Sequence, residues 1–98
     1  MTIRQLALVH SFNKRYANPV SVAYVKHKKL CMLALMSGMS HDDLRQLAYV
    51  GVLNAARLYD PERGSFDNFA HIHIRAEIGN TLRKTPFVRL MKLDKSEW

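Results

Sequence analysis

Three histidines and one neighbouring carboxylate are the residues whose types and spacing come nearest to catalytic chemistry. His41 precedes Asp42, and His71 and His73 lie two positions apart, a pattern compatible with a metal-dependent hydrolase. On a helix, however, residues two positions apart project about 200° from each other, so His71 and His73 cannot bind one ion. The sequence shows no nucleophile motif and no glycine-rich phosphate loop. We therefore predict no enzymatic activity, no metal site and no cofactor.

Phosphate neutralisation is a second kind of chemistry, indicated by basic residues in the last third of the chain. Residues 66–84 predict a helix whose apolar i,i+4 line consists of Phe66, Ala70, Ile74, Ile78 and Leu82. The remaining faces carry Asn68, His71, His73, Arg75, Ala76 and Asn80. The basic residues that close the helix or follow it are Arg83, Lys84, Arg89, Lys92 and Lys95. Such an array favours nucleic acid, although cations also stabilise the negative end of a helix.

Charge is unevenly distributed along the 98 residues. The formal net charge of +7 divides into six basic and no acidic side chains in residues 1–41, three and five in 42–67, and six and three in 68–98. Two basic ends around a mildly acidic middle favour a polyanion partner for the ends and a different partner for the middle. Ordinary solubilising charge is the alternative.

Composition predicts one compact, all-α domain. The chain is 48% hydrophobic with only 4 Gly and 3 Pro, and strand-like alternation is absent. We expect an irregular bundle of four to five helices in residues 1–84, followed by a basic tail or short helix in 85–98. The single Cys31 excludes an internal disulfide and fits a cytoplasmic protein, with the thiol in the core. The apolar run at 30–36 is too short to span a bilayer.

A helical hairpin in residues 42–84 is the central element of this bundle. Ser40 is a good N-cap for the first arm, with Asp43 at the capping-box position. The apolar face of that arm consists of Leu44, Leu47, Ala48, Gly51, Ala55 and Leu58. Pro61 ends the arm and Gly64 turns the chain, after which Ser65 or Asp67 caps the second arm.

Two further helices are expected before the hairpin. The first, residues 2–17, has the candidate inward positions Ile3, Leu6, Ala7, Phe12 and Tyr16. The second, residues 20–37, has the buried side Val22, Val25, Leu30, Leu33 and Ala34, a solvated basic cluster at 26–29, and Gly38 as its C-cap.

The hairpin also resembles a known protein family. DDLxQ, a helix with Gly51 at its middle, and YDPxRGSFxxFAxIxIRxxIxxxLRK are similar to conserved region 2 of sigma-70-type transcription initiation factors. The Ile-x-Ile-Arg run is nearest to the flagellar, stress and sporulation branch. The resemblance covers residues 20–84 and implies a sigma region 2 fold.

The resemblance implies that the second arm contacts the minus-ten promoter element and flipped bases of the non-template strand. It places Phe69 where the family has a base-stacking aromatic, whereas burial in the core is the alternative for Phe69 and the expectation for Phe66. Ile72 and His73 occupy the positions of the tryptophan pair of primary sigma factors, and Ala76 and Gly79 cannot read a base pair through a side-chain hydrogen bond. The predicted DNA-binding residues are Asn68, Phe69, Ile72, His73, Arg75, Ala76, Arg83, Lys84 and Arg89.

The first arm resembles the segment that docks on a coiled coil in the largest subunit of core RNA polymerase. Asp43, Leu44 and Gln46 match that segment, whereas residues 47–49 replace its usual Glu-Gly-Asn. Capping of the helix is the alternative role for Asp42 and Asp43. The predicted polymerase-binding residues are Asp42, Asp43, Arg45, Gln46, Tyr49 and Asn54.

The resemblance as a whole implies a sigma-like initiation factor that binds core polymerase and promoter DNA. We expect it to lack a domain for the minus-thirty-five element, so that an accessory subunit supplies upstream recognition, unless the sequence is one domain of a longer factor. The alternative is a polymerase- or partner-binding regulatory module that keeps the fold but has lost promoter recognition. No membrane partner is expected.

Overall fold

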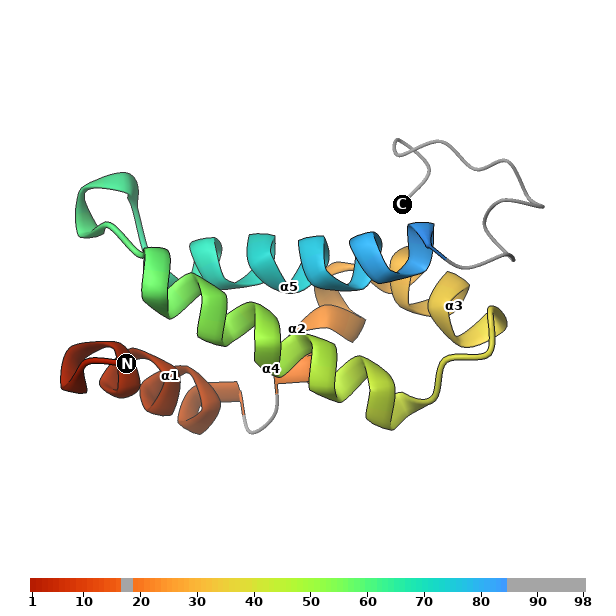
Figure 1. Cartoon of the computed structure of the whole chain (residues 1–98), viewed down its shortest axis with the longest axis horizontal. Helices are drawn as coiled ribbons and strands as arrows, with labels where there is room; N and C mark the ends of the chain where they lie inside the picture. The colour runs from red at the N-terminus through yellow and green to blue at the C-terminus, as the bar shows by residue number, and fades with distance from the viewer. Residues whose placement is uncertain (17–18, 85–98) are drawn as a thin grey trace.

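The computed structural model describes residues 1–16 and 19–84 and has an all-α architecture (Figure 1). Its helices are α1 (Ile3–Tyr16), α2 (Pro19–Lys26), α3 (Lys28–Met36), α4 (His41–Leu58), the 3-10 helix η1 (Pro61–Arg63) and α5 (Phe66–Arg83). This confirms the predicted fold class. The predicted tail, with Arg89, lies outside the described residues.

The hairpin forms as predicted: α4 and α5 pack against each other and diverge toward the start of α4 (Figure 1). At the start of α4, the Ser40 hydroxyl accepts from the Asp43 N–H at 3.0 Å and the Asp43 carboxylate accepts from the Ser40 N–H at 2.9 Å. This reciprocal pair is the predicted capping box. Gly64 has a φ of 117°, and the Ser65 hydroxyl, not Asp67, caps α5 by accepting from the Asn68 N–H at 3.3 Å.

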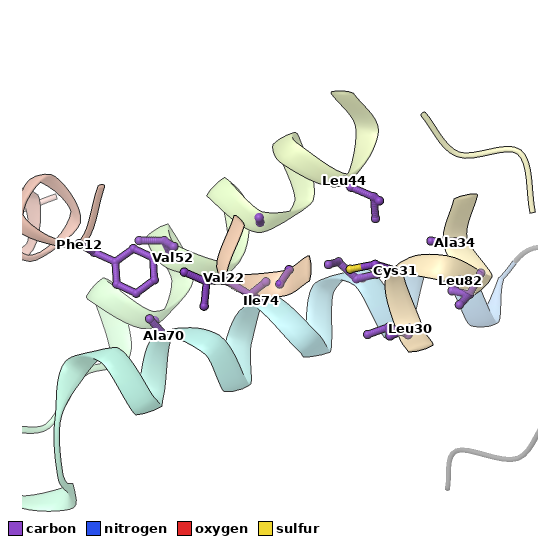
Figure 2. Close-up of a cluster of buried hydrophobic side chains, with 14 of the residues drawn as sticks. Phe12, Val22, Leu30, Cys31, Ala34, Leu44, Val52, Ala70, Ile74 and Leu82 are labelled. Atoms are coloured by element: carbon purple, nitrogen blue, oxygen red, sulfur yellow. The ribbon is translucent and has the colours of Figure 1, made fainter. Parts of the chain in front are cut away.

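The core lies between the hairpin and the shorter helices (Figure 2). The whole predicted line of α5 is buried, and α4 contributes to the same core cluster with side chains that include Leu44, Ala48, Val52 and Ala55. The prediction for Leu58 was wrong: it is 65% exposed, because α4 ends there and the following turn leads the chain away.

A glycine permits the close approach of the two arms. A Cβ on Gly51 would lie 2.6 Å from the Cα of Ile74 and 2.7 Å from its backbone nitrogen. Any side chain at this position would therefore collide with the backbone of α5.

The predicted second helix is broken in two. His27, with φ −132° and ψ 53°, separates α2 from α3, and its half-buried ring packs against His71 of α5 at a centroid distance of 5.5 Å. The solvated cluster at 26–29 is thus interrupted by one inward ring. Val25, predicted to be buried, is 70% exposed, because the break ends α2 one residue later.

The inward positions of α1 were also largely mispredicted. Phe12 is fully buried, but Ile3 is 88% exposed and Leu6, Ala7 and Tyr16 are exposed as well. The partly buried apolar residues of this helix are instead Leu8 and Val9. The helix is apolar on two sides, and its contacts with α2 and α4 cover only one of them.

Candidate functional site

An aromatic cluster surrounds Phe69 near the start of α5. The half-buried Phe69 ring lies 6.0 Å from the ring of Tyr59 and 4.6 Å from that of His73. Tyr59 follows the end of α4, and its hydroxyl donates to the carbonyl of Gly64 at 2.8 Å, which fixes the ring across the turn. Phe66, in contrast, is only 6% exposed. Phe69 therefore has one side in the fold and another accessible to a ligand, whereas Phe66 belongs to the core.

The outward surface of α5 continues from this cluster. Its exposed residues among the predicted DNA-binding set are Asn68, Ile72, Arg75 and Ala76, with Lys84 at the end of the helix. Ile72 is 62% exposed, so this strip offers an apolar contact beside a basic one. Arg83 is half-buried and donates to the Asn80 side chain.

The acidic start of α4 forms a second exposed surface, which contains the predicted residues Asp42, Asp43, Arg45, Gln46 and Tyr49. The Asp42 carboxylate forms an ion pair with Arg45 and accepts from the Gln46 amide at 3.1 Å. Hydrogen bonds from the backbone N–H and the hydroxyl of Ser40 lower the pKa of Asp43. Asp43 thus serves as a capping residue and remains exposed to a partner.

Asn54, the last residue of the predicted polymerase-binding set, has a different position. Its half-buried amide donates to Glu77 of α5 at 2.9 Å, and its carbonyl oxygen accepts from Arg57 at 2.7 Å. The side chain therefore links α4 to α5.

Two residues that lie beside these surfaces were absent from the predicted sets of DNA-binding and polymerase-binding residues. Tyr59 supports Phe69 across the turn, and Leu53, 38% exposed, follows Tyr49 by one helical turn. An aromatic residue just before a turn was the available signal for Tyr59. Together with Val50, 41% exposed, Tyr49 and Leu53 make the α4 surface partly apolar.

The histidines do not gather into a catalytic or metal site. His71 packs on His27 and His73 packs on Phe69. Burial lowers the pKa of both His27 and His71, and for His27 the proximity of His71 lowers it further. Among the described residues, no group of three or more His, Cys, Asp or Glu side chains is placed to hold a metal ion. Nor is any described helix both long and apolar enough to cross a membrane.

The fold is thus a helical hairpin in which one arm carries an aromatic cluster and the other begins with exposed carboxylates. The family model described as Sigma-70 region 2 matches residues 3–86, and the chain belongs to this family. This family is non-enzymatic. Membership in it implies that the chain is a sigma factor that binds core RNA polymerase and the minus-ten promoter element.

The match confirms the predicted family and extends it. It begins at Ile3, whereas the resemblance was expected from residue 20, so α1 is part of the family domain. Comparison with curated proteins and with solved structures gave no significant match.

Proposed function

We propose that α5 presents Phe69 to the unpaired non-template strand of the minus-ten element while α4 docks on the coiled coil of the largest polymerase subunit. The observation that carries this proposal is the half-buried Phe69 ring, supported by Tyr59 and His73 and followed by an exposed strip containing Arg75. A supported ring with an accessible side suits base stacking, which is worth about 1–3 kcal/mol per base.

The docking half of the proposal depends on the exposed start of α4. Asp42, Asp43 and Gln46 are exposed there, and Asp43 and Gln46 are among the residues that match the family's docking segment. The apolar residues Tyr49, Val50 and Leu53 lie further along the same helix and would extend the contact with a protein partner.

Promoter choice would depend less on this domain than in primary sigma factors. Ile72 and His73 stand in place of the tryptophan pair, as in the flagellar, stress and sporulation branch, to which we assign the chain. Ala76 is exposed but has no hydrogen-bonding side chain, and Gly79 has no side chain beyond hydrogen. We propose that an accessory subunit contributes to recognition of the upstream promoter DNA.

The second candidate function is a polymerase-binding regulatory module without promoter recognition. Ala76 and Gly79 favour this function because neither can read a base pair through a side-chain hydrogen bond. The exposed apolar residues Tyr49, Val50 and Leu53 of α4 favour it because they suit contact with a protein. The two candidates differ in whether the domain binds single-stranded minus-ten DNA in a sequence-dependent way.

A binding assay with a fluorescent single-stranded oligonucleotide separates these functions. The proposal predicts tighter binding to a minus-ten sequence than to its scrambled version, and a loss of about 5- to 150-fold with Phe69→Ala. Tyr49→Ala, which removes an exposed aromatic from α4, is the matched control and leaves DNA binding unchanged. Equal affinity for both oligonucleotides would refute promoter recognition and favour the regulatory module.

Docking is tested by co-purification with core polymerase. Asp43→Asn together with Gln46→Ala removes one charge and one amide, while asparagine can still accept the capping hydrogen bond. We expect this variant to lose polymerase and Phe69→Ala to retain it. Undiminished co-purification of the α4 variant would show that the docking surface is elsewhere.

A further inference from the structure

The carboxylate of Asp67, in the first turn of α5, is held by two residues from the end of α1. The Tyr16 hydroxyl donates to Oδ2 at 2.8 Å, and the Arg15 guanidinium forms an ion pair with Oδ1. Arg15 also donates to the Ser11 hydroxyl at 2.7 Å, which orients its side chain along α1. We call Arg15, Tyr16 and Asp67 the Asp67 latch.

The latch lies at one end of a series of ring contacts that leads to Phe69. The successive centroid distances are 4.8 Å for Tyr16–Phe12, 6.1 Å for Phe12–Phe66, 5.3 Å for Phe66–Tyr59 and 6.0 Å for Tyr59–Phe69. Asp67 itself precedes Phe69 by two residues on α5. The end of α1 and the accessible ring of α5 therefore belong to one side-chain cluster.

Asp67 carries the only negative charge in the first turn of α5. An acid at a helix N-terminus is favoured by the helix dipole, which explains its place in the fold. Its side chain is 33% exposed and turned toward α1. Residues two positions apart on a helix project about 200° from each other, so Asp67 acts on Phe69 through the backbone of the first turn they share.

We infer that the Asp67 latch positions the nucleic-acid site: Arg15 and Tyr16 hold Asp67 and thereby orient the first turn of α5, which carries Phe69. The inference rests on the proposed function, because it requires single-stranded DNA at Phe69. Arg15 is a positioning residue that acts through Asp67. The pKa of the Tyr16 hydroxyl is raised, mainly by its hydrogen bond to Asp67 and to a lesser extent by burial. The hydroxyl therefore keeps the proton that it donates to Asp67.

A double-mutant cycle tests this role, with Arg15→Gln, Asp67→Asn and the double variant titrated against the minus-ten oligonucleotide. We expect Arg15→Gln to weaken binding by about 1.4- to fivefold, the range that an exposed ion pair supports. In the Asp67→Asn background, the same change should cost no more than Lys14→Gln does. Lys14 is the matched control, since it has the same charge in the same last turn of α1.

A second readout distinguishes positioning from general stability. With 2-aminopurine at each adenine of the oligonucleotide in turn, quenching at saturating protein reports stacking on Phe69. Arg15→Gln should reduce the quenching at saturation, Arg15→Lys should restore it, and both variants should be fully folded at the assay temperature.

Two results would overturn the inference while leaving the proposed function intact. If Arg15→Gln costs the same factor in both backgrounds, Arg15 contacts a phosphate directly. If quenching at saturation is unchanged, the latch does not position Phe69. If the wild-type protein does not bind the oligonucleotide, or Phe69→Ala binds equally well, the proposed function fails and the inference fails with it.

Discussion

Substitution of Gly51 by alanine tests the packing that brings the two arms of the hairpin together. In an exposed helical position the change would stabilise the protein by about 0.5–1 kcal/mol, because alanine loses less conformational freedom on folding. At Gly51, however, the new Cβ would lie 2.6 Å from the Cα of Ile74, 2.7 Å from its nitrogen and 3.0 Å from the carbonyl carbon of His73.

All three of these atoms belong to the backbone of α5, so no side-chain rotation can relieve the collision. Ordinary contact begins at 3.4 Å, which means that the helices must separate by roughly 0.8 Å. Overpacking of this kind costs about 1–3 kcal/mol and exceeds the gain in helix propensity. We expect a net loss of about 1–2 kcal/mol, or a Tm lower by about 4–16 °C for a domain of this size.

Gly79→Ala is the matched control. Gly79 is also helical, but a Cβ there has nothing within 4 Å. The Gly79→Ala substitution should raise the free energy of unfolding by about 0.5–1 kcal/mol. Urea unfolding followed by circular dichroism measures both variants, and Gly51→Ala unfolding at the same or a higher midpoint than the wild type would refute the packing argument.

Three further predictions concern single features of the fold. Ser40→Ala removes the cap of α4 and should lower the free energy of unfolding by about 1 kcal/mol in urea titrations, and an unchanged midpoint would contradict the importance of the capping box. The pKa values of His27 and His71 are lowered by burial, so below about pH 6.5 the unfolded chain binds more protons and stability should fall as the pH falls. Unfolding midpoints between pH 7.5 and 5 measure this, and a slope unchanged in the His27→Gln/His71→Gln variant would contradict it. Burial raises the pKa of Cys31 to about 11, so iodoacetamide at pH 7.5 should alkylate the native protein far more slowly than the urea-unfolded chain, and equal rates would contradict that burial.

The sequence was sufficient to predict the hairpin because its signals are local. The i,i+4 line from Phe66 to Leu82, the Ser40 cap and the turn at Gly64 each depend on residues within a few positions of one another. The same periodicity failed in α1, where Ile3 and Leu8 lie on different apolar sides and only tertiary packing selects the buried one.

The break at His27 and the latch at Asp67 could not be predicted for a related reason. No proline or glycine marks the break, and the ring that packs against His27 is 44 positions later in the chain. The partners of Asp67 are 51 and 52 positions earlier. The family resemblance was sufficient to nominate Phe69 as the base-stacking residue. The packing of Tyr59 against Phe69 was visible only in the three-dimensional arrangement, because the two residues lie on either side of the turn.

Photo-crosslinking in a reconstituted polymerase–promoter complex tests the division of roles between the two arms most directly. p-Benzoylphenylalanine is placed at Phe69 in one variant and at Gln46 in another. We predict that position 69 crosslinks to the non-template strand within the minus-ten element and that position 46 crosslinks to the largest polymerase subunit. Crosslinking of position 69 to polymerase alone, or of position 46 to DNA, would contradict the account.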